Sequence, residues 1–152
     1  KLVWLDAHLD LKERVGDHVS HDVVVRELLN HGFSEEDIVF LGITEIDHDE
    51  EKFLETRDCT IYRAGEVLSQ ALEREQFKGP VYLSVDIDVI RESEAPGTGY
   101  RDGRLGPDQV LEVIESVNPD HADLVEVAPS LDRKNTTVEN SQKILKQLIK
   151  HV

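Results

Sequence analysis

The first apolar stretch of the chain runs into polar side chains and reads Leu2-Val-Trp-Leu-Asp-Ala-His-Leu-Asp10. Asp6, His8 and Asp10 follow a run of four apolar residues and stand two positions apart. In a β-strand, side chains at positions i, i+2 and i+4 point to the same face of the sheet. The stretch therefore predicts a buried strand whose end presents three groups that bind metal ions.

A second stretch far downstream repeats this arrangement. Residues 81–85 are apolar apart from Ser84, and Asp86 and Asp88 follow them two positions apart. Two strands that each end in oxygen or nitrogen ligands predict a shared metal site. Such an oxygen-rich ligand set suits Mn²⁺ or a similar divalent ion better than a structural zinc ion. Two such ions about 3.5–4 Å apart can share bridging carboxylates and activate one water molecule.

The remaining sequence alternates between strand-like and helix-like segments. Strands are expected at residues 38–43, 60–63, 81–87 and 124–127. Helices are expected at residues 22–30, 50–57, 67–72, 107–117 and 138–149. This alternation, with no hairpin signal between two strands, predicts a parallel sheet covered by helices on both faces. Ligands of such sheets bind at the carboxyl ends of the strands, where the five polar residues above and Glu126 are all expected.

Composition narrows the classes of function. The 152 residues fit one domain, and 32 acidic against 17 basic side chains give a formal net charge of −15. Such a chain repels nucleic acid, and no apolar run is long enough to span a membrane. Cys59 is the only cysteine, which excludes a disulfide framework within the chain and favours a cytoplasmic location. Because the chain lacks methionine and starts on a strand that reads as internal, we expect an N-terminal portion to be missing.

Five short motifs together carry a resemblance to a known family. They are Asp-Ala-His-Leu-Asp at 6–10, Ser-His at 20–21, Ser-Val-Asp-Ile-Asp at 84–88, Ala-Pro-Gly-Thr-Gly at 95–99 and Glu-Val-Ala-Pro at 126–129. In this order, across nearly the whole chain, they resemble motifs of the ureohydrolases, the arginase and agmatinase family. The resemblance implies a three-layer α/β/α fold with a mostly parallel sheet, and a single but partial arginase-like domain over residues 1–152.

The resemblance also implies a role for each site residue. Two Mn²⁺ ions would lie at the strand ends, bridged by Asp6 and Asp86. Asp10 would bind one ion, while His8 and Asp88 would bind the other. His21 would carry a proton to the leaving amine, and Glu126 would pair with the substrate guanidinium through two hydrogen bonds.

The activity implied by the family is hydrolysis of a guanidino C–N bond, which releases urea and an amine. The loop at residues 12–19 lacks the Asn that arginases use to hold an amino acid. This absence favours agmatine or another small guanidino compound over arginine as the substrate. Family members also form homo-oligomers, usually trimers or hexamers, so we expect the same of this chain.

The chain departs from the family pattern at several positions. Arg91 and Glu92 stand where the family has Asp-Pro, and we expect Arg91 to add positive charge near the site. Asp22, Thr44 and Ala128 replace a Gly, an Arg and an Asn of the pattern. A further metal-binding His of the family, in a Gly-Gly-Asp-His motif, is expected upstream of the first residue.

Three other functions remain open on the sequence. The chain could be a degenerate homologue that serves as a structural or regulatory subunit, or a deacetylase of related fold with a single metal ion. A phospho-acceptor receiver domain also has acidic strand ends, but it has no use for His8. At the level of single residues, His21 could simply cap the following helix, and Glu126 could be an ordinary strand-end carboxylate.

Overall fold

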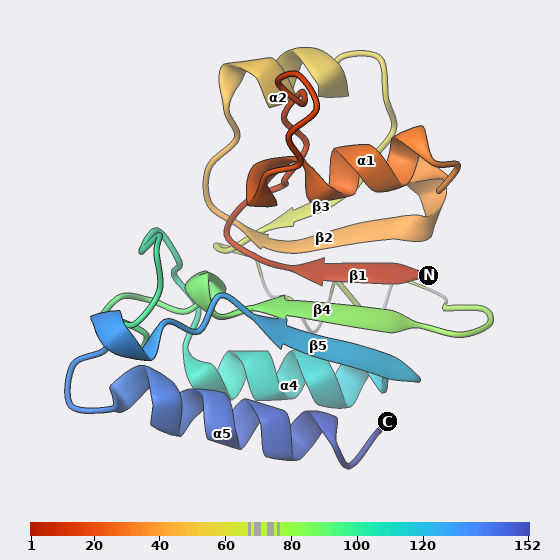
Figure 1. The fold of residues 1–152 in the computed structure, drawn as a ribbon. Helices are drawn as coiled ribbons and strands as arrows, with labels where there is room; N and C mark the ends of the chain where they lie inside the picture. The colour runs from red at the N-terminus through yellow and green to blue at the C-terminus, as the bar shows by residue number, and fades with distance from the viewer. Residues whose placement is uncertain (67, 69–70, 73–74, 76) are drawn as a thin grey trace.

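Five parallel strands form one sheet in the computed structural model, which describes residues 1–152 apart from 67, 69–70, 73–74 and 76 (Figure 1). The strand order is β3-β2-β1-β4-β5, with β1 at the centre. The strands are β1 (Leu2–Leu5), β2 (Ile38–Ile43), β3 (Thr60–Arg63), β4 (Tyr82–Asp86) and β5 (His121–Val125).

The central position of β1 follows from its sequence. All four of its residues are buried, as are the six residues of β2, so these strands have the unbroken apolar pattern of a sheet covered on both faces. In the register of the sheet, Leu5 of β1 lies beside Leu41 of β2 and Val85 of β4. The residues that follow Leu5 and Val85 are therefore brought to the same edge of the sheet.

Helices cover the two faces of the sheet in pairs (Figure 1). The first pair, α1 (Val24–Asn30) and α2 (His48–Leu54), lies beside the half of the sheet that contains β2 and β3. The second pair, α4 (Pro107–Val117) and α5 (Thr136–Leu148), lies beside β4 and β5. None of the described helices is long and apolar enough to cross a lipid bilayer.

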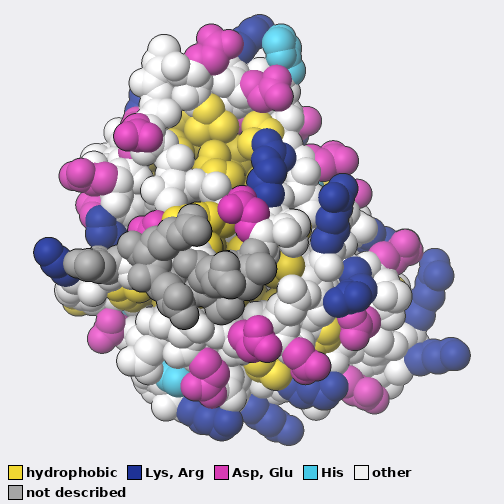
Figure 2. Space-filling model, turned by 180° about the vertical axis from the view of Figure 1, so that it is seen from behind, with side chains coloured by type: hydrophobic (Ala, Val, Ile, Leu, Met, Phe, Trp, Pro, Cys, Tyr) yellow, Lys and Arg dark blue, Asp and Glu magenta, His cyan; other side chains and the backbone are white. Residues whose placement is uncertain are grey.

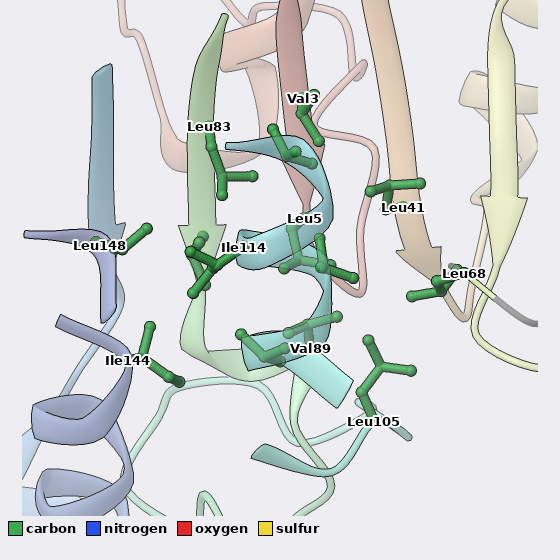
Figure 3. Packing of buried hydrophobic residues seen from close by; sticks show 14 of the residues in the cluster. Val3, Leu5, Leu41, Leu68, Leu83, Val89, Leu105, Ile114, Ile144 and Leu148 are labelled. Atoms are coloured by element: carbon green, nitrogen blue, oxygen red, sulfur yellow. The ribbon is translucent and has the colours of Figure 1, made fainter. Parts of the chain in front are cut away.

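Alternate residues of β1 and β2 enter two separate hydrophobic cores. Val3 and Leu5 pack into a cluster that includes Ile114 of α4 and Ile144 of α5, as Figure 3 shows. Trp4 belongs to a second cluster, in which Leu2, Ile38 and Phe40 from the strands contact Val25 of α1. Because neighbouring strand residues point to opposite faces, the two clusters confirm the predicted three-layer arrangement. Asp and Glu side chains lie among Lys and Arg on the face seen from behind (Figure 2).

Several elements begin or end away from the positions that the sequence predicts. The strand expected at 124–127 is β5, which ends at Val125, and Glu126 follows it with a left-handed φ of 60°. The helix expected at 22–30 begins as a 3₁₀ turn, His21–Val23, and becomes α-helical only from Val24. Part of the helix expected at 67–72 lies outside the described residues.

Candidate metal centre and active site

Three buried carboxylates meet at the carboxyl ends of β1 and β4. Asp6 follows β1 and Asp86 ends β4, and these two residues and Asp88 are 2%, 7% and 3% exposed. A short 3₁₀ turn, Ile87–Val89, returns Asp88 toward β1, because the Asp88 amide donates to Asp86 Oδ1 at 2.8 Å. The amide of Ala7 in turn donates to Asp88 Oδ1 at 3.3 Å. The carboxylates are thus held by the backbone of the strand ends.

The imidazole of His8 completes a compact set of ligand atoms. Its Nδ1 lies 3.0 Å from Asp88 Oδ2 and 3.5 Å from Asp6 Oδ1. The His8 amide also donates to Asp6 Oδ1 at 2.7 Å, which holds the loop after β1 in place. One ligand atom from each of Asp6, His8 and Asp88 lies within 4.8 Å of the others, so this trio could hold a metal ion.

Burial and mutual repulsion disfavour the ionised forms of the clustered carboxyls. Burial, together with the charges of Asp88 and Asp6, raises the pKa of Asp86 to about 10. Burial, with the charge of Asp6, likewise raises the pKa of Asp10 to about 8. Hydrogen bonds to Asp6 and Asp88 raise the pKa of the His8 imidazole to about 11. The cluster therefore holds more negative charge than it accommodates alone, and a divalent cation fits this donor set.

The cluster lines a cavity of about 480 Å³. The cavity lies at the carboxyl ends of β1 and β4, where ligands of open parallel sheets bind. Every site residue predicted from the sequence lines it, namely Asp6, His8, Asp10, His21, Asp86, Asp88 and Glu126.

The two residues predicted to be catalytic differ from the metal-binding trio in exposure. His21 and Glu126 are exposed side chains on the cavity lining. His21 is the first residue of the 3₁₀ turn before α1, whose N-cap is Val23, so His21 does not cap that helix. Glu126 lines the cavity directly after the end of β5, in the left-handed conformation described above. Both side chains are thus accessible to a molecule that enters the cavity.

Arg91 does not bring positive charge into the cavity, contrary to expectation. Its Nε pairs with Glu94 Oε2 at 2.8 Å, and Glu92 pairs with Arg101 at 3.2 Å. Neither Arg91 nor Glu92 is among the described residues that line the cavity. The charges of Arg91 and Glu92, which stand in place of the family's Asp-Pro, are therefore paired outside the cavity lining.

Among the lining residues that the sequence did not single out, Glu50, Tyr100 and Asp102 matter most for the site. Glu50 is 4% exposed and accepts the amides of Leu11 and Asp47, both at 3.0 Å. The sequence could have indicated this role of Glu50, because Asp47 and Glu50 have the spacing of a helix capping box. Tyr100 and Asp102 also line the cavity, in a loop whose sequence carries no comparable local signal.

Comparisons with known proteins place this site in a family. The sequence pattern of the arginase family matches residues 1–150. The chain belongs to the arginase family. Over 97% of its length it is 31% identical to the agmatinase of Halalkalibacterium halodurans, and over 90% it is 32% identical to the guanidinobutyrase of Pseudomonas aeruginosa. It covers 54% and 47% of these relatives, so it spans about half of their length.

A solved structure supports the arginase-family fold. The agmatine ureohydrolase of Thermoplasma volcanium superposes on 97% of this chain with a TM-score of 0.85 and 26% identity. The chain covers 53% of that protein. The parallel sheet and its flanking helices are thus those of an arginase-family α/β fold.

Proposed function

We propose that this arginase-family chain belongs to a metal-dependent hydrolase that cleaves a guanidino C–N bond and releases urea. The observation that carries the proposal is the meeting of Asp6, His8 and Asp88 in the lining of one cavity that Asp10 and Asp86 also line. These residues stand in the two motifs that the sequence shares with the family.

This donor set supports two manganese ions as the proposed cofactor. Asp6 and Asp86 would bridge the ions, Asp10 would bind one of them, and His8 and Asp88 would bind the other. Burial and neighbouring carboxylates raise the pKa values of Asp86 and Asp10, and a bound cation would keep both carboxyls ionised. When bound, such ions supply Lewis-acid activation of water and substrate.

The exposed pair on the cavity lining would handle the substrate. The Glu126 carboxylate would accept two hydrogen bonds from the guanidinium. These bonds would orient the guanidinium carbon toward the proposed metal ligands. The His21 imidazole would donate a proton to the nitrogen of the leaving amine, the role of a general acid. The aromatic ring of Tyr100 beside His21 would limit the movement of that imidazole.

The charge of the cavity favours a small cationic substrate. Asp and Glu make up more than half of the lining, and Lys12 is the one lysine or arginine among the described residues there. Lys12 is itself neutralised by Asp47, with Nζ 2.7 Å from the carboxylate. The remaining field would attract a guanidinium group. We therefore favour agmatine or another guanidino compound without a carboxylate, with no nucleic acid or membrane as a partner.

The cellular location and the oligomeric state are also proposals. We place the protein in the cytoplasm, because its lone cysteine suits a reducing compartment. We also propose a homo-oligomer, a trimer or a hexamer, as the assembled form. Sedimentation of the purified protein tests the assembly, and a monomer at micromolar concentration would contradict it.

The activity has a direct test. The full-length protein is incubated with Mn²⁺ and, separately, agmatine, arginine or 4-guanidinobutyrate, and urea is measured. We expect urea from agmatine, and none from agmatine after Asp86→Asn. An exposed control, Asp108→Asn on α4, should keep the activity. Urea from no substrate, together with Mn²⁺ binding, would instead favour a structural or regulatory role.

A further inference from the structure

Tyr100 occupies a position between the two histidines of the cavity. Its ring centroid lies 5.4 Å from that of His8, with an interplanar angle of 67°. The same ring lies 5.7 Å from that of His21, with an angle of 42°. One aromatic side chain thus contacts both a proposed metal ligand and the proposed proton donor. Edge-to-face and tilted contacts at these distances are favourable.

The backbone that carries Tyr100 is anchored to the turn that carries Asp88. A Cβ atom at Gly103 would lie 2.0 Å from the Asp88 carbonyl oxygen, so the two backbones touch there. Two residues further, the Leu105 amide donates to the Val89 carbonyl at 3.1 Å, and the Arg91 amide donates to the Leu105 carbonyl at 3.0 Å. The loop is therefore fastened beside the acid cluster at its C-terminal side.

Asp102 faces the opposite nitrogen of the His8 ring. Its Oδ2 lies 3.7 Å from His8 Nε2, an ion-pair distance, while Nδ1 of the same ring faces Asp88 at 3.0 Å. At this distance the carboxylate attracts the outer side of the ring electrostatically and so favours its orientation, and loss of a carboxylate partner of a metal-binding His typically weakens metal binding. Asp102 thus acts on the same side chain that Tyr100 contacts.

We propose that Tyr100 is a positioning residue, whose ring holds the imidazoles of His8 and His21 in a fixed relation above the acid cluster. Asp102 assists it by keeping Nδ1 of His8 turned toward Asp6 and Asp88. The geometry that carries this inference is the double ring contact on a loop fastened at Gly103. The inference rests on the proposed function for the roles of the two histidines, but the placement of their rings can be measured independently.

Variants at position 100 separate the ring from the hydroxyl. Tyr100 is 51% exposed, so Tyr100→Ala should leave the fold intact. Tyr100→Phe keeps the ring and serves as the conservative rescue. Phe33→Ala removes an aromatic side chain that is 47% exposed and does not line the cavity, and it is the matched control. Asp102→Ala tests the assisting carboxylate.

Three measurements are made on each variant. They are the ring-proton NMR shifts of His8 and His21 in the chain without metal, the Mn²⁺ affinity by calorimetry, and kcat and KM for urea release. For Tyr100→Ala we expect both histidine shifts to move, the Mn²⁺ affinity to fall about tenfold, and kcat to fall more than KM rises. Asp102→Ala should lower the Mn²⁺ affinity in the same direction. Tyr100→Phe and Phe33→Ala should match the unaltered protein in every measurement.

The results distinguish this inference from the proposed function. Unmoved histidine shifts in Tyr100→Ala, with urea still released by the unaltered protein, would overturn the positioning role and leave the hydrolase standing. Moved shifts and weaker Mn²⁺ binding, with no urea from any variant, would support the positioning role and overturn the hydrolase. A loss in Tyr100→Phe equal to that in Tyr100→Ala would show that the hydroxyl acts rather than the ring, and would also overturn the inference.

Discussion

The carboxylates at the ends of β1 and β4 lower the stability of the metal-free chain, while they provide the ligands for the proposed metal site. Asp6, Asp86 and Asp88 are buried together, with His8 as the nearest cation in contact with Asp6 and Asp88. Burial of like charges costs free energy, and the raised pKa of Asp86 records that cost. Removing one negative charge should therefore help the metal-free chain to fold, while it harms the proposed metal site.

Asp86→Asn should make this conflict measurable. The amide oxygen of Asn can still accept the Asp88 amide, so the turn after β4 keeps its hydrogen bond. We expect the free energy of unfolding in chelator to rise by about 1 kcal/mol, and the Mn²⁺ affinity to fall at least tenfold. Urea denaturation with and without Mn²⁺ checks both. The exposed Asp108→Asn should change neither, and a destabilised metal-free Asp86→Asn protein would contradict the repulsion.

A close backbone contact leaves room only for glycine at position 103. The Cβ of an alanine there would overlap the Asp88 carbonyl oxygen, while a Cβ at Gly99 in the same loop would meet nothing within 4 Å. We expect Gly103→Ala to destabilise the protein by about 1–3 kcal/mol, as overpacked sites do, and to weaken Mn²⁺ binding. Gly99→Ala is the matched control. Equal unfolding midpoints for the two variants in urea would refute the close approach.

Among the elements, α5 depends on a side chain that precedes it. Asp132 Oδ1 accepts the amide and hydroxyl of Thr137 at 3.1 and 3.0 Å, and its Oδ2 accepts the Val138 amide at 3.0 Å. These bonds satisfy amides of the first helical turn, which have no partner within the helix. The α5 helix supplies Ile144 and Leu148 to the hydrophobic core that also contains residues of α4 and the sheet. Loss of the hydrogen bonds at the start of α5 should therefore lower the stability of the fold.

Asp132→Ala should therefore destabilise the fold by about 1–2 kcal/mol. Desolvation opposes ionisation of Asp132, but the hydrogen bonds from Val138 and Thr137 outweigh it and lower the pKa below its ordinary value. A lowered pKa means that this contribution is fully present above the ordinary Asp pKa of about 4 and is lost as the pH falls below it. The stability difference between Asp132→Ala and the unaltered protein should thus shrink between about pH 5 and pH 2, as measured by urea denaturation. The exposed Asp58→Ala should show no such difference.

At the scale of the whole molecule, negative charge dominates. The net charge of −15 works against compaction, and the most concentrated part of it lies at the carboxyl ends of the central strands. A divalent ion in the cavity would relieve that concentration without any change of fold. Metal binding and folding should therefore be coupled, since the carboxylates converge only in the folded chain.

Added Mn²⁺ should stabilise the chain by about 2.7 kcal/mol at a concentration one hundred times its Kd. Calorimetry of thermal unfolding checks this, and a chelator should reverse the gain. NaCl at matched ionic strength is the control for screening of the net charge. Asp86→Asn is the control for Mn²⁺ binding to acidic groups outside the cavity. A gain from NaCl equal to that from Mn²⁺ would place the effect in screening alone.

The sequence by itself determined the parts of the site that lie at strand ends. Apolar runs that stop at Asp6-x-His8-x-Asp10 and Asp86-x-Asp88 carry the two-residue period of a strand, and parallel sheets gather such ends at one edge. The layers followed from the alternation of strand and helix patterns. These features are local, so they can be read without knowing which strands are neighbours.

Tertiary structure alone decided that β1 lies beside β4, with Leu5 next to Val85, and that the loop after β4 turns Tyr100 between His8 and His21. It also turned Arg91 away toward Glu94. Each of these outcomes rests on packing between segments that local sequence patterns do not link. The contact of Gly103 with the Asp88 carbonyl is of this kind, because a close approach of two backbones leaves no periodic trace in either segment.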